Sequence, residues 1–185
     1  MERAGRPTKS LEDWVDEGLK LLAQQGVDAV KVERLATALG VTKGSFYWHF
    51  RDRDALLAAM LERWQAVSTQ AVMARIDAIG GTPAERLRTL IQSTSQIKRA
   101  ARIEHAIRAW AAREKSARTV LQAVDSTREA YVEGLLIEHG LSVAHAKLRA
   151  RVLYLALIGE FAWVSHGGSP SGGEPWQELV DLVLG

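Results

Sequence analysis

The polar side chains that could do chemistry gather in one short stretch, residues 31–53, KVERLATALGVTKGSFYWHFRDR. This stretch holds five basic and two acidic residues, a net charge of +3, whereas the whole chain of 185 residues carries only +2. Lys43, Tyr47 and His49 supply hydrogen-bond donors close together, and Gly44 leaves room for the backbone to approach a partner. Cations and donors in this arrangement suit a phosphate-lined groove, so the stretch is a candidate nucleic-acid interface.

Sequence patterns typical of catalytic and metal-binding sites are absent. No G-x-S-x-G, H-E-x-x-H or G-x4-G-K-[ST] motif occurs, and none of the five histidines lies three or four residues from another. The chain has no cysteine, which excludes a disulfide framework and a thiolate metal site. We therefore expect no enzyme activity, no metal site and no cofactor.

The apolar residues of the same stretch predict two short helices joined by a tight turn. Leu35 and Leu39 lie one helical turn apart on the first helix, and Phe46 and Phe50 lie one turn apart on the second. Gly40 stands where a left-handed residue usually ends a helix. This spacing is typical of a helix-turn-helix motif, whose second helix would present the polar face described above.

The residues GVTKGSFYWHFRDRDALL, 40–57, resemble the DNA-binding domain of TetR-family (tetracycline-repressor-like) transcriptional regulators. The similarity rests on the turn glycine, the Thr-Lys-Gly triplet, the Tyr-x-His-Phe run and a basic residue three positions after that Phe. It covers residues 10–65, and the rest of the chain is similar in architecture alone. The resemblance implies a homodimeric repressor that binds a palindromic operator in double-stranded DNA and releases it when a small-molecule inducer binds the C-terminal domain.

The resemblance also implies which residues contact DNA. Two positions depart from the family pattern, because Lys31 replaces the usual Thr or Ser and Trp48 occupies a variable position. The residues that match phosphate-gripping positions are Lys31, Thr42, Ser45, His49 and Arg53. The residues that match groove-reading positions are Lys43, Gly44, Tyr47 and Trp48.

The composition is that of a soluble globular protein, with 47% apolar and 25% charged residues. No uncharged apolar run reaches the length of roughly 18 residues that a transmembrane helix needs. The basic start MERAGRPTKS is not followed by the apolar segment of a secretory signal. We therefore expect a cytoplasmic protein without membrane contact.

Helical periodicity runs through the whole chain, and no alternating pattern predicts a strand. Capping signals mark several helix starts: Ser10 with Asp13, Thr42, and Thr82 with Glu85. The expected helices are 10–25, 31–39, 42–50, 52–79, 83–98, 102–113, 116–139, 142–166 and 176–184. The sequence predicts an all-α fold, with a three-helix helix-turn-helix DNA-binding domain at 1–52 and a helical-bundle ligand-binding and dimerisation domain at 53–185.

The predicted helix at 142–166 is apolar over most of its circumference, which is typical of a helix buried on two sides. Together with the helix at 176–184, it is expected to form a four-helix interface across a twofold axis. The alternative is a monomer with a large core. The predicted interface residues are Leu153, Leu157, Trp176, Leu179, Val180 and Val183.

Aromatic residues lie on several helices of the predicted body. Buried Trp and Tyr side chains need hydrogen-bond partners, which a ligand can supply, although core packing explains each aromatic taken singly. A polar contact to the ligand is expected from His105, Arg108 or Glu160, and for His105 exposure to solvent is the alternative. The predicted ligand-binding residues are Trp64, His105, Arg108, Trp110, Tyr131, Tyr154, Glu160, Phe161 and Trp163.

The sequence therefore predicts a homodimeric transcription regulator, a repressor released from its operator by a small, largely apolar inducer. The alternative function is a DNA-associated architectural or division-control protein without an inducer, for which a filled, ligand-free body is expected. A small-molecule-processing helical enzyme is disfavoured because no paired catalytic groups are found.

Overall fold

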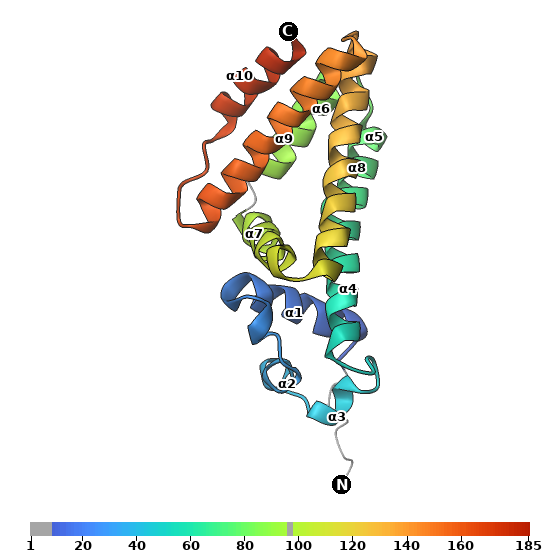
Figure 1. Cartoon of the computed structure of the whole chain (residues 1–185), viewed down its shortest axis with the longest axis vertical. Coiled ribbons are helices and arrows are strands. Elements are labelled where there is room, and N and C mark those ends of the chain that lie inside the picture. The colour runs from blue at the N-terminus through green and yellow to red at the C-terminus, as the bar shows by residue number, and fades with distance from the viewer. Residues whose placement is uncertain (1–8, 96–97) are drawn as a thin grey trace. The chain divides into compact units, whose positions relative to one another are not determined.

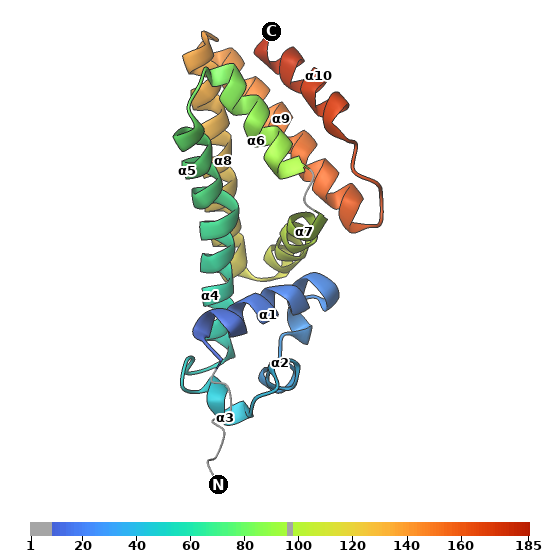
Figure 2. The same cartoon turned by 180° about the vertical axis from the view of Figure 1, so that it is seen from behind.

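The computed structural model describes residues 9–95 and 98–185. All regular structure in these residues is helical, which confirms the all-α class (Figures 1 and 2). The chain divides into two compact units, Met1–Trp64 and Gln65–Gly185. The boundary between them lies inside a long helical run, whereas the sequence predicts a domain boundary at about residue 52.

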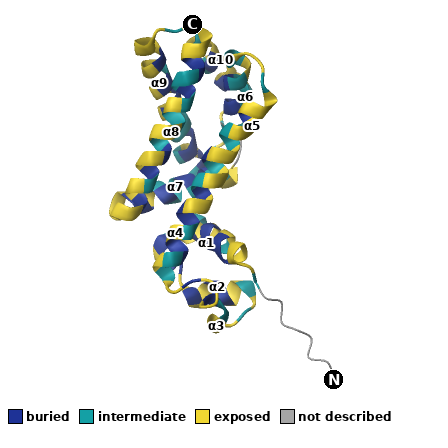
Figure 3. Ribbon diagram, turned by 90° about the vertical axis from the view of Figure 1, so that its right-hand side faces the viewer, coloured by how far each residue is buried: buried dark blue, intermediate teal, exposed yellow. Residues whose placement is uncertain are grey.

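The N-terminal unit consists of short helices in which α1 contacts α2, and α2 contacts α3. Exposed residues cover much of α3, whereas the other helices of the unit mix exposed and buried residues (Figure 3). The elements are α1 (Leu11–Gln25), the 3₁₀ turn η1 (Val27–Ala29), α2 (Val32–Leu39), α3 (Lys43–Phe46) and α4 (Arg53–Gln65), which crosses the unit boundary.

Aromatic packing holds the helix-turn-helix together. Trp14 of α1 and Phe46 of α3 are fully buried, and their rings meet edge to face with centroids 5.3 Å apart. Phe50 stacks on Phe46 at the same centroid distance. Leu35 is also buried, whereas Leu39 is partly exposed. The predicted inward positions of Leu35, Phe46 and Phe50 are thus confirmed, and such aromatic pairs add about 0.5–1.5 kcal/mol beyond burial.

The turn between α2 and α3 has the predicted left-handed glycine. Gly40 has φ 69° and ends α2, and the Val41 N–H donates to the Ala36 carbonyl oxygen at 3.0 Å. These bonds satisfy carbonyls at the end of α2 that otherwise lack a helical partner. A side chain with a Cβ is strained at this φ, so glycine is the residue that permits the turn.

The second helix of the motif is shorter than the sequence predicts. Helix α3 ends at Phe46, and the chain continues as a turn in which the His49 N–H donates to the Phe46 carbonyl oxygen at 2.9 Å. Gly44 in this single turn is a poor helix former, which explains the early end. Thr42 occupies the N-cap position but makes no side-chain capping bond, so that part of the prediction is wrong.

Other helix starts are capped as expected. Ser10 and Asp13 form a capping box at α1, and Thr82 and Glu85 form one at α6. Asp52 accepts a hydrogen bond from the Ala55 N–H at 2.8 Å at the start of α4. These local signals are readable from sequence because both partners lie within one helical turn.

The C-terminal unit is a helical bundle. Helices α7, α8 and α9 contact one another, while α6 packs against α8 and α10. None of the helices within residues 9–95 and 98–185 is both long and apolar enough to cross a membrane. The elements are the π-helical turn η2 (Ala66–Gln70), α5 (Ala71–Ile79), α6 (Pro83–Ser95), α7 (Lys98–Arg113), α8 (Lys115–His139), α9 (Val143–Ser165) and α10 (Gly173–Leu184).

The residues predicted to form a dimer interface help to build the core of the chain itself. Helix α10 packs against α6 and α9, so the apolar side of α10 covers its own bundle. Leu153, Trp176, Val180 and Val183 are buried in this core, and Leu157 and Leu179 are partly buried against it.

Helix α1 packs closely on α4 at Gly18, where a larger side chain would not fit. A Cβ added at Gly18 would lie 2.7 Å from the Sδ atom of Met60, a fully buried side chain. We expect Gly18→Val to lower the free energy of unfolding by about 1–3 kcal/mol through overpacking. In contrast, Gly134→Ala should raise it by about 1 kcal/mol, because the new methyl group meets nothing within 4 Å. Thermal unfolding of both variants tests this, and an unchanged Tm for Gly18→Val would contradict it.

Candidate nucleic-acid interface and buried polar cluster

The surface around α3 carries exposed aromatic side chains. Trp48 is 86% exposed and Tyr47 is 55% exposed, although both are large and partly apolar. Lys43 and Gly44 are exposed beside them. The Tyr47 ring packs edge to face on the buried Phe46 ring, with centroids 5.3 Å apart, but more than half of Tyr47 and most of Trp48 remain exposed. The face is therefore available to a partner.

Lys43 is paired with an acidic residue of α2. Its Nζ atom donates to the Glu33 carboxylate, and this hydrogen bond lowers the pKa of Glu33 and raises the pKa of Lys43. Both side chains are more than half exposed, so water and salt weaken the pair. The ammonium group of Lys43 can consequently move to an anionic partner at small cost.

Of the other predicted contact residues, Lys31, Thr42 and His49 are exposed, whereas Ser45 and Arg53 are partly buried. Ser45 Oγ donates to the Thr42 carbonyl oxygen at 2.7 Å. His49 Nε2 lies 2.9 Å from the Lys9 carbonyl oxygen, so a protonated Nε2 ties the start of the described chain to this face. Lys31 and Thr42 occupy the N-cap positions of α2 and α3.

Arg53 has a different role from its neighbours. Its Nε atom donates to the Val30 carbonyl oxygen at 2.6 Å, and its Nη2 atom donates to the Val27 carbonyl oxygen at 2.7 Å. The side chain is partly buried. Two of its three side-chain nitrogen atoms therefore connect the residues of the turn η1 to the start of α4. The contact of Arg53 with a DNA phosphate stays a prediction.

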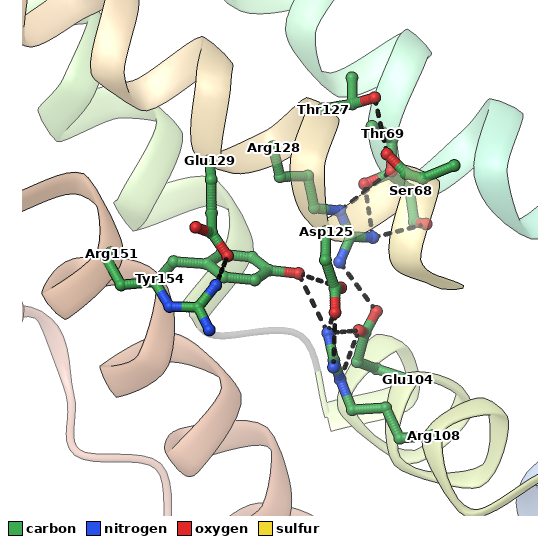
Figure 4. Close-up of polar contacts among 11 residues, drawn as sticks. Ser68, Thr69, Glu104, Arg108, Asp125, Thr127, Arg128, Glu129, Arg151 and Tyr154 are labelled. Atoms are coloured by element: carbon green, nitrogen blue, oxygen red, sulfur yellow. Dashed lines mark hydrogen bonds and ion pairs between the residues drawn. The ribbon is translucent and has the colours of Figure 1, made fainter. Parts of the chain in front are cut away.

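A buried polar cluster joins α7, α8 and α9 (Figure 4). Arg108 donates to Glu104 at 3.0 Å through Nε, and to both carboxylate oxygens of Asp125 at 3.1 and 2.7 Å. Tyr154 Oη donates to Asp125 at 2.6 Å and accepts from Arg108 at 3.0 Å. Arg128 donates to the second oxygen of Glu104 at 3.1 Å. Two cations thus balance two anions inside the bundle.

The electrostatics of this cluster keep its cations charged and its phenol protonated. Burial disfavours the charged form of both Arg108 and Arg128. For Arg108, the hydrogen bond to Asp125 and the charge of Glu104 outweigh this cost of burial. For Arg128, the charge of Glu104 outweighs it. The pKa of each guanidinium therefore lies above its usual value. Burial raises the pKa of Tyr154 as well, and its hydrogen bond to Asp125 adds to the effect. Tyr154 consequently acts as a hydrogen-bond donor.

Only part of this cluster was readable from the sequence. Arg108 and Tyr154 are among the predicted ligand-binding residues, and the structure brings them into contact. Glu104, Asp125 and Arg128 were missed as functional candidates. Glu104 and Arg108 lie four residues apart on one helix, which is a usable local signal. The pairing of Asp125 and Arg128 with another helix has no such signal.

Two further predicted ligand-binding residues hold the loop that follows α9. The Glu160 carboxylate accepts from the Ser171 N–H and from the Ser171 hydroxyl, both at 2.7 Å. Trp163 Nε1 donates to the Ser169 carbonyl oxygen at 3.1 Å. These hydrogen bonds hold the Gly- and Ser-rich loop between α9 and α10 at two points.

The remaining ligand-binding candidates lie at separate places. Tyr131 Oη donates to Asp77 of α5 at 2.7 Å. His105 packs edge to face on His166 with ring centroids 4.7 Å apart, and burial together with His166 lowers the pKa of His105. The other three candidates are buried. Phe161 packs against Ala101 and Val164, and Trp64 is the last residue of the N-terminal unit. The indole N–H of Trp110 has no hydrogen-bond partner in the described structure.

The N-terminal unit carries a helix-turn-helix motif with an exposed polar and aromatic face, which is typical of a DNA-binding domain. Residues 15–60 match the model of "Bacterial regulatory proteins, tetR family". Over 48 residues the chain is 42% identical to the HTH-type transcriptional regulator AcrR of Shigella flexneri, covering 26% of this chain and 22% of AcrR. Over 73 residues it is 32% identical to the nucleoid occlusion factor SlmA of Haemophilus ducreyi, covering 37% of this chain and 36% of SlmA.

The fold agrees over nearly the whole length with solved structures. The regulator FadR of Bacillus subtilis, solved in complex with stearoyl-CoA, superposes with a TM-score of 0.71 at 15% identity, covering 95% of this chain and 98% of FadR. The sequence matches to AcrR and SlmA cover 22% and 36% of the length of those proteins. Residues 15–60 thus match the DNA-binding domain of the TetR family.

The contrast between Arg53 and Lys31 generates a prediction. Arg53→Met should lower the free energy of unfolding by about 1–3 kcal/mol, because the Val27 and Val30 carbonyl groups lose their donors. Lys31→Met removes an exposed charge and should change the free energy of unfolding by less than about 0.5 kcal/mol. Urea unfolding compares the two. Equal stabilities would show that Arg53 does not hold η1.

Proposed function

We propose that this protein is a homodimeric transcriptional repressor that binds a twofold-symmetric operator in double-stranded DNA and is released from it by a small molecule. The observation that carries the proposal is the exposed face formed by Lys43, Gly44, Tyr47 and Trp48 on a TetR-family domain. DNA binding of this kind takes place in the cytoplasm of a bacterium.

The chemistry of this face suits the major groove. Lys43 and Tyr47 offer donors to base edges and phosphates, and the Trp48 indole offers an apolar surface to thymine methyl groups. A Cβ added at Gly44 would meet only Thr42 Oγ1, at an ordinary 3.7 Å. The fold therefore does not require glycine at this position, whereas a closely approaching DNA backbone would.

The exposed side of α9 supports the homodimer. Leu148, Val152 and Leu155 are exposed there, and Gly159 continues the same face one turn further on. An apolar stripe of this kind on a surface helix is typical of an interface. A second copy of the chain is the partner that a twofold-symmetric operator requires.

The inducer is proposed to bind in the C-terminal unit, with Arg108 and Tyr154 as its polar contacts. FadR of Bacillus subtilis, which shares the fold, was solved with stearoyl-CoA. In this chain the two side chains are in contact and mostly buried. A ligand that reaches them would therefore be selected by its charge and hydrogen-bonding groups as well as by its shape. The apolar character of the inducer remains part of the proposal.

The second candidate function is that of an architectural or division-control protein, as the match to SlmA indicates. The family model and the AcrR match favour the regulator. The two candidates differ in how selectively they bind DNA, because an architectural protein relies mainly on phosphate contacts, which are sensitive to salt.

Fluorescence anisotropy of a labelled fragment from upstream of the protein's own gene tests the proposal, with a scrambled fragment as the comparison. The regulator predicts tight binding that stays selective as the salt concentration rises. Equal binding to both fragments, lost together at higher salt, would contradict recognition at that fragment and favour the architectural candidate.

Two lysines provide a matched test of the DNA-binding face. Lys43 and Lys20 are 52% and 53% exposed, and each is paired with one glutamate. Lys43→Met should weaken operator binding by about 1–3 kcal/mol, since it removes a groove contact, while Lys20→Met should leave it nearly unchanged. Anisotropy titrations with both variants measure the difference. Equal losses would mean that net charge, and not the position of Lys43, governs binding.

Two helical glycines provide a matched test of the dimer. An added Cβ meets nothing within 4 Å at either Gly159 of α9 or Gly134 of α8. Gly159→Leu should therefore fold normally and yet give monomers, because the new side chain would separate the two α9 helices. Gly134→Leu should remain dimeric. Light scattering measures both, and a stable Gly159→Leu dimer would contradict the α9 interface.

A further inference from the structure

The helical run from α4 to α5 changes its hydrogen bonding at η2. There the Ala71 N–H donates to the carbonyl oxygen of Ala66, five residues earlier, instead of to the residue four positions back. Such π-turns are rare and occur frequently at functional sites. The flanking residues are ordinary α-helix, and a side chain that bonds to the helix backbone is one known cause of such a local change.

Arg128 of α8 supplies that interaction (Figure 4). Its Nε atom donates to Thr69 Oγ1 at 3.0 Å, and its Nη2 atom donates to the Ser68 carbonyl oxygen at 3.2 Å and to Ser68 Oγ at 3.0 Å. Thr69 is only 2% exposed. A guanidinium that holds a backbone carbonyl and two hydroxyls of one turn favours the conformation in which these three acceptors converge.

The position of Arg128 depends in turn on the buried cluster. Its Nη1 atom donates to Glu104, which is 3% exposed and also accepts from Arg108. Arg108 is held by Asp125 and Tyr154. A continuous series of charged hydrogen bonds therefore links α9 to η2, and a group that enters the cluster must rearrange Glu104 or Arg108 to find partners.

We propose that Arg128 is a positioning residue that maintains the π-turn η2 and thereby controls operator affinity. The inference rests on the proposed DNA-binding function and assigns its regulation to this contact. The turn directly follows α4, the last helix of the N-terminal unit. A shift between π and α hydrogen bonding changes the rise and twist of the run through which α4 continues. Arg128 thus connects the state of the buried cluster to the helix that enters the DNA-binding unit.

Hydrogen exchange of the full chain without DNA tests the contact itself. In Ser68→Ala/Thr69→Val, both hydroxyl acceptors are removed while the pairing of Arg128 with Glu104 is retained. We expect faster exchange of the amides in η2 and in the first turn of α5, with other helices unchanged. Arg128→Lys should have the same effect, because an ammonium cannot reach all the acceptors in the guanidinium geometry.

Arg118 of α8 offers the matched control. It also donates to backbone carbonyl oxygens, those of Ala111 and Ala112 at the end of α7, but has no bond to η2. Arg118→Lys should therefore leave the exchange of η2 unchanged, even where it lowers Tm. Faster exchange of η2 in this control as well, or unchanged exchange in Ser68→Ala/Thr69→Val, would overturn the inference.

Operator titration tests the regulatory consequence. Both η2 variants should bind a wild-type operator fragment at least about fivefold more weakly per folded molecule, the lower end of usual coupling between sites, and Arg118→Lys should not. Wild-type affinity in both η2 variants would overturn the regulatory role. A wild-type chain that fails to bind DNA would instead contradict the proposed function, while the exchange experiment would still decide whether Arg128 holds the turn.

Discussion

The C-terminal unit depends on the requirement that charges inside it be paired. An ionised group taken out of water without a partner costs several kcal/mol, so a helix that carries Glu104 inward must meet cations there. Arg108 on its own helix and Arg128 on α8 satisfy this need, and Asp125 and Tyr154 complete the hydrogen bonds of Arg108. The register of α7, α8 and α9 is therefore fixed by polar geometry as well as by apolar packing.

The N-terminal unit follows a different principle. Its core is apolar and aromatic, with Phe46 between Trp14 and Phe50, and the partly buried Arg53 donates to the carbonyl oxygens of Val27 and Val30 beside that core. Because Phe46 and Phe50 supply the contacts with the core, Tyr47 and Trp48, which lie between them in the sequence, can remain exposed. The five-residue segment 46–50 thus fills the core with Phe46 and Phe50 and exposes the three residues between them.

Local features of the fold were readable from the sequence, and long-range ones were not. The capping boxes, the left-handed Gly40 and the all-α class follow from residues within one or two turns of each other. The packing of Trp176 and Val180 in the core of the chain itself could not be predicted from the sequence, because it depends on α10 folding back on α6 and α9, which a periodic pattern cannot specify. The π-turn at η2 was missed for the same reason, since its stabilising residue, Arg128, lies on another helix.

In the proposed function, two copies of the helix-turn-helix face bind a specific DNA sequence. Selection of bound duplexes from a random pool by the purified protein, followed by sequencing, tests it most directly. The proposed function predicts enrichment of an inverted repeat whose half-sites are centred about one DNA turn, roughly 34 Å, or a multiple of it apart. A pool that shows no enriched motif after repeated selection at moderate salt would contradict sequence-specific recognition, and an enriched single half-site would contradict the dimer.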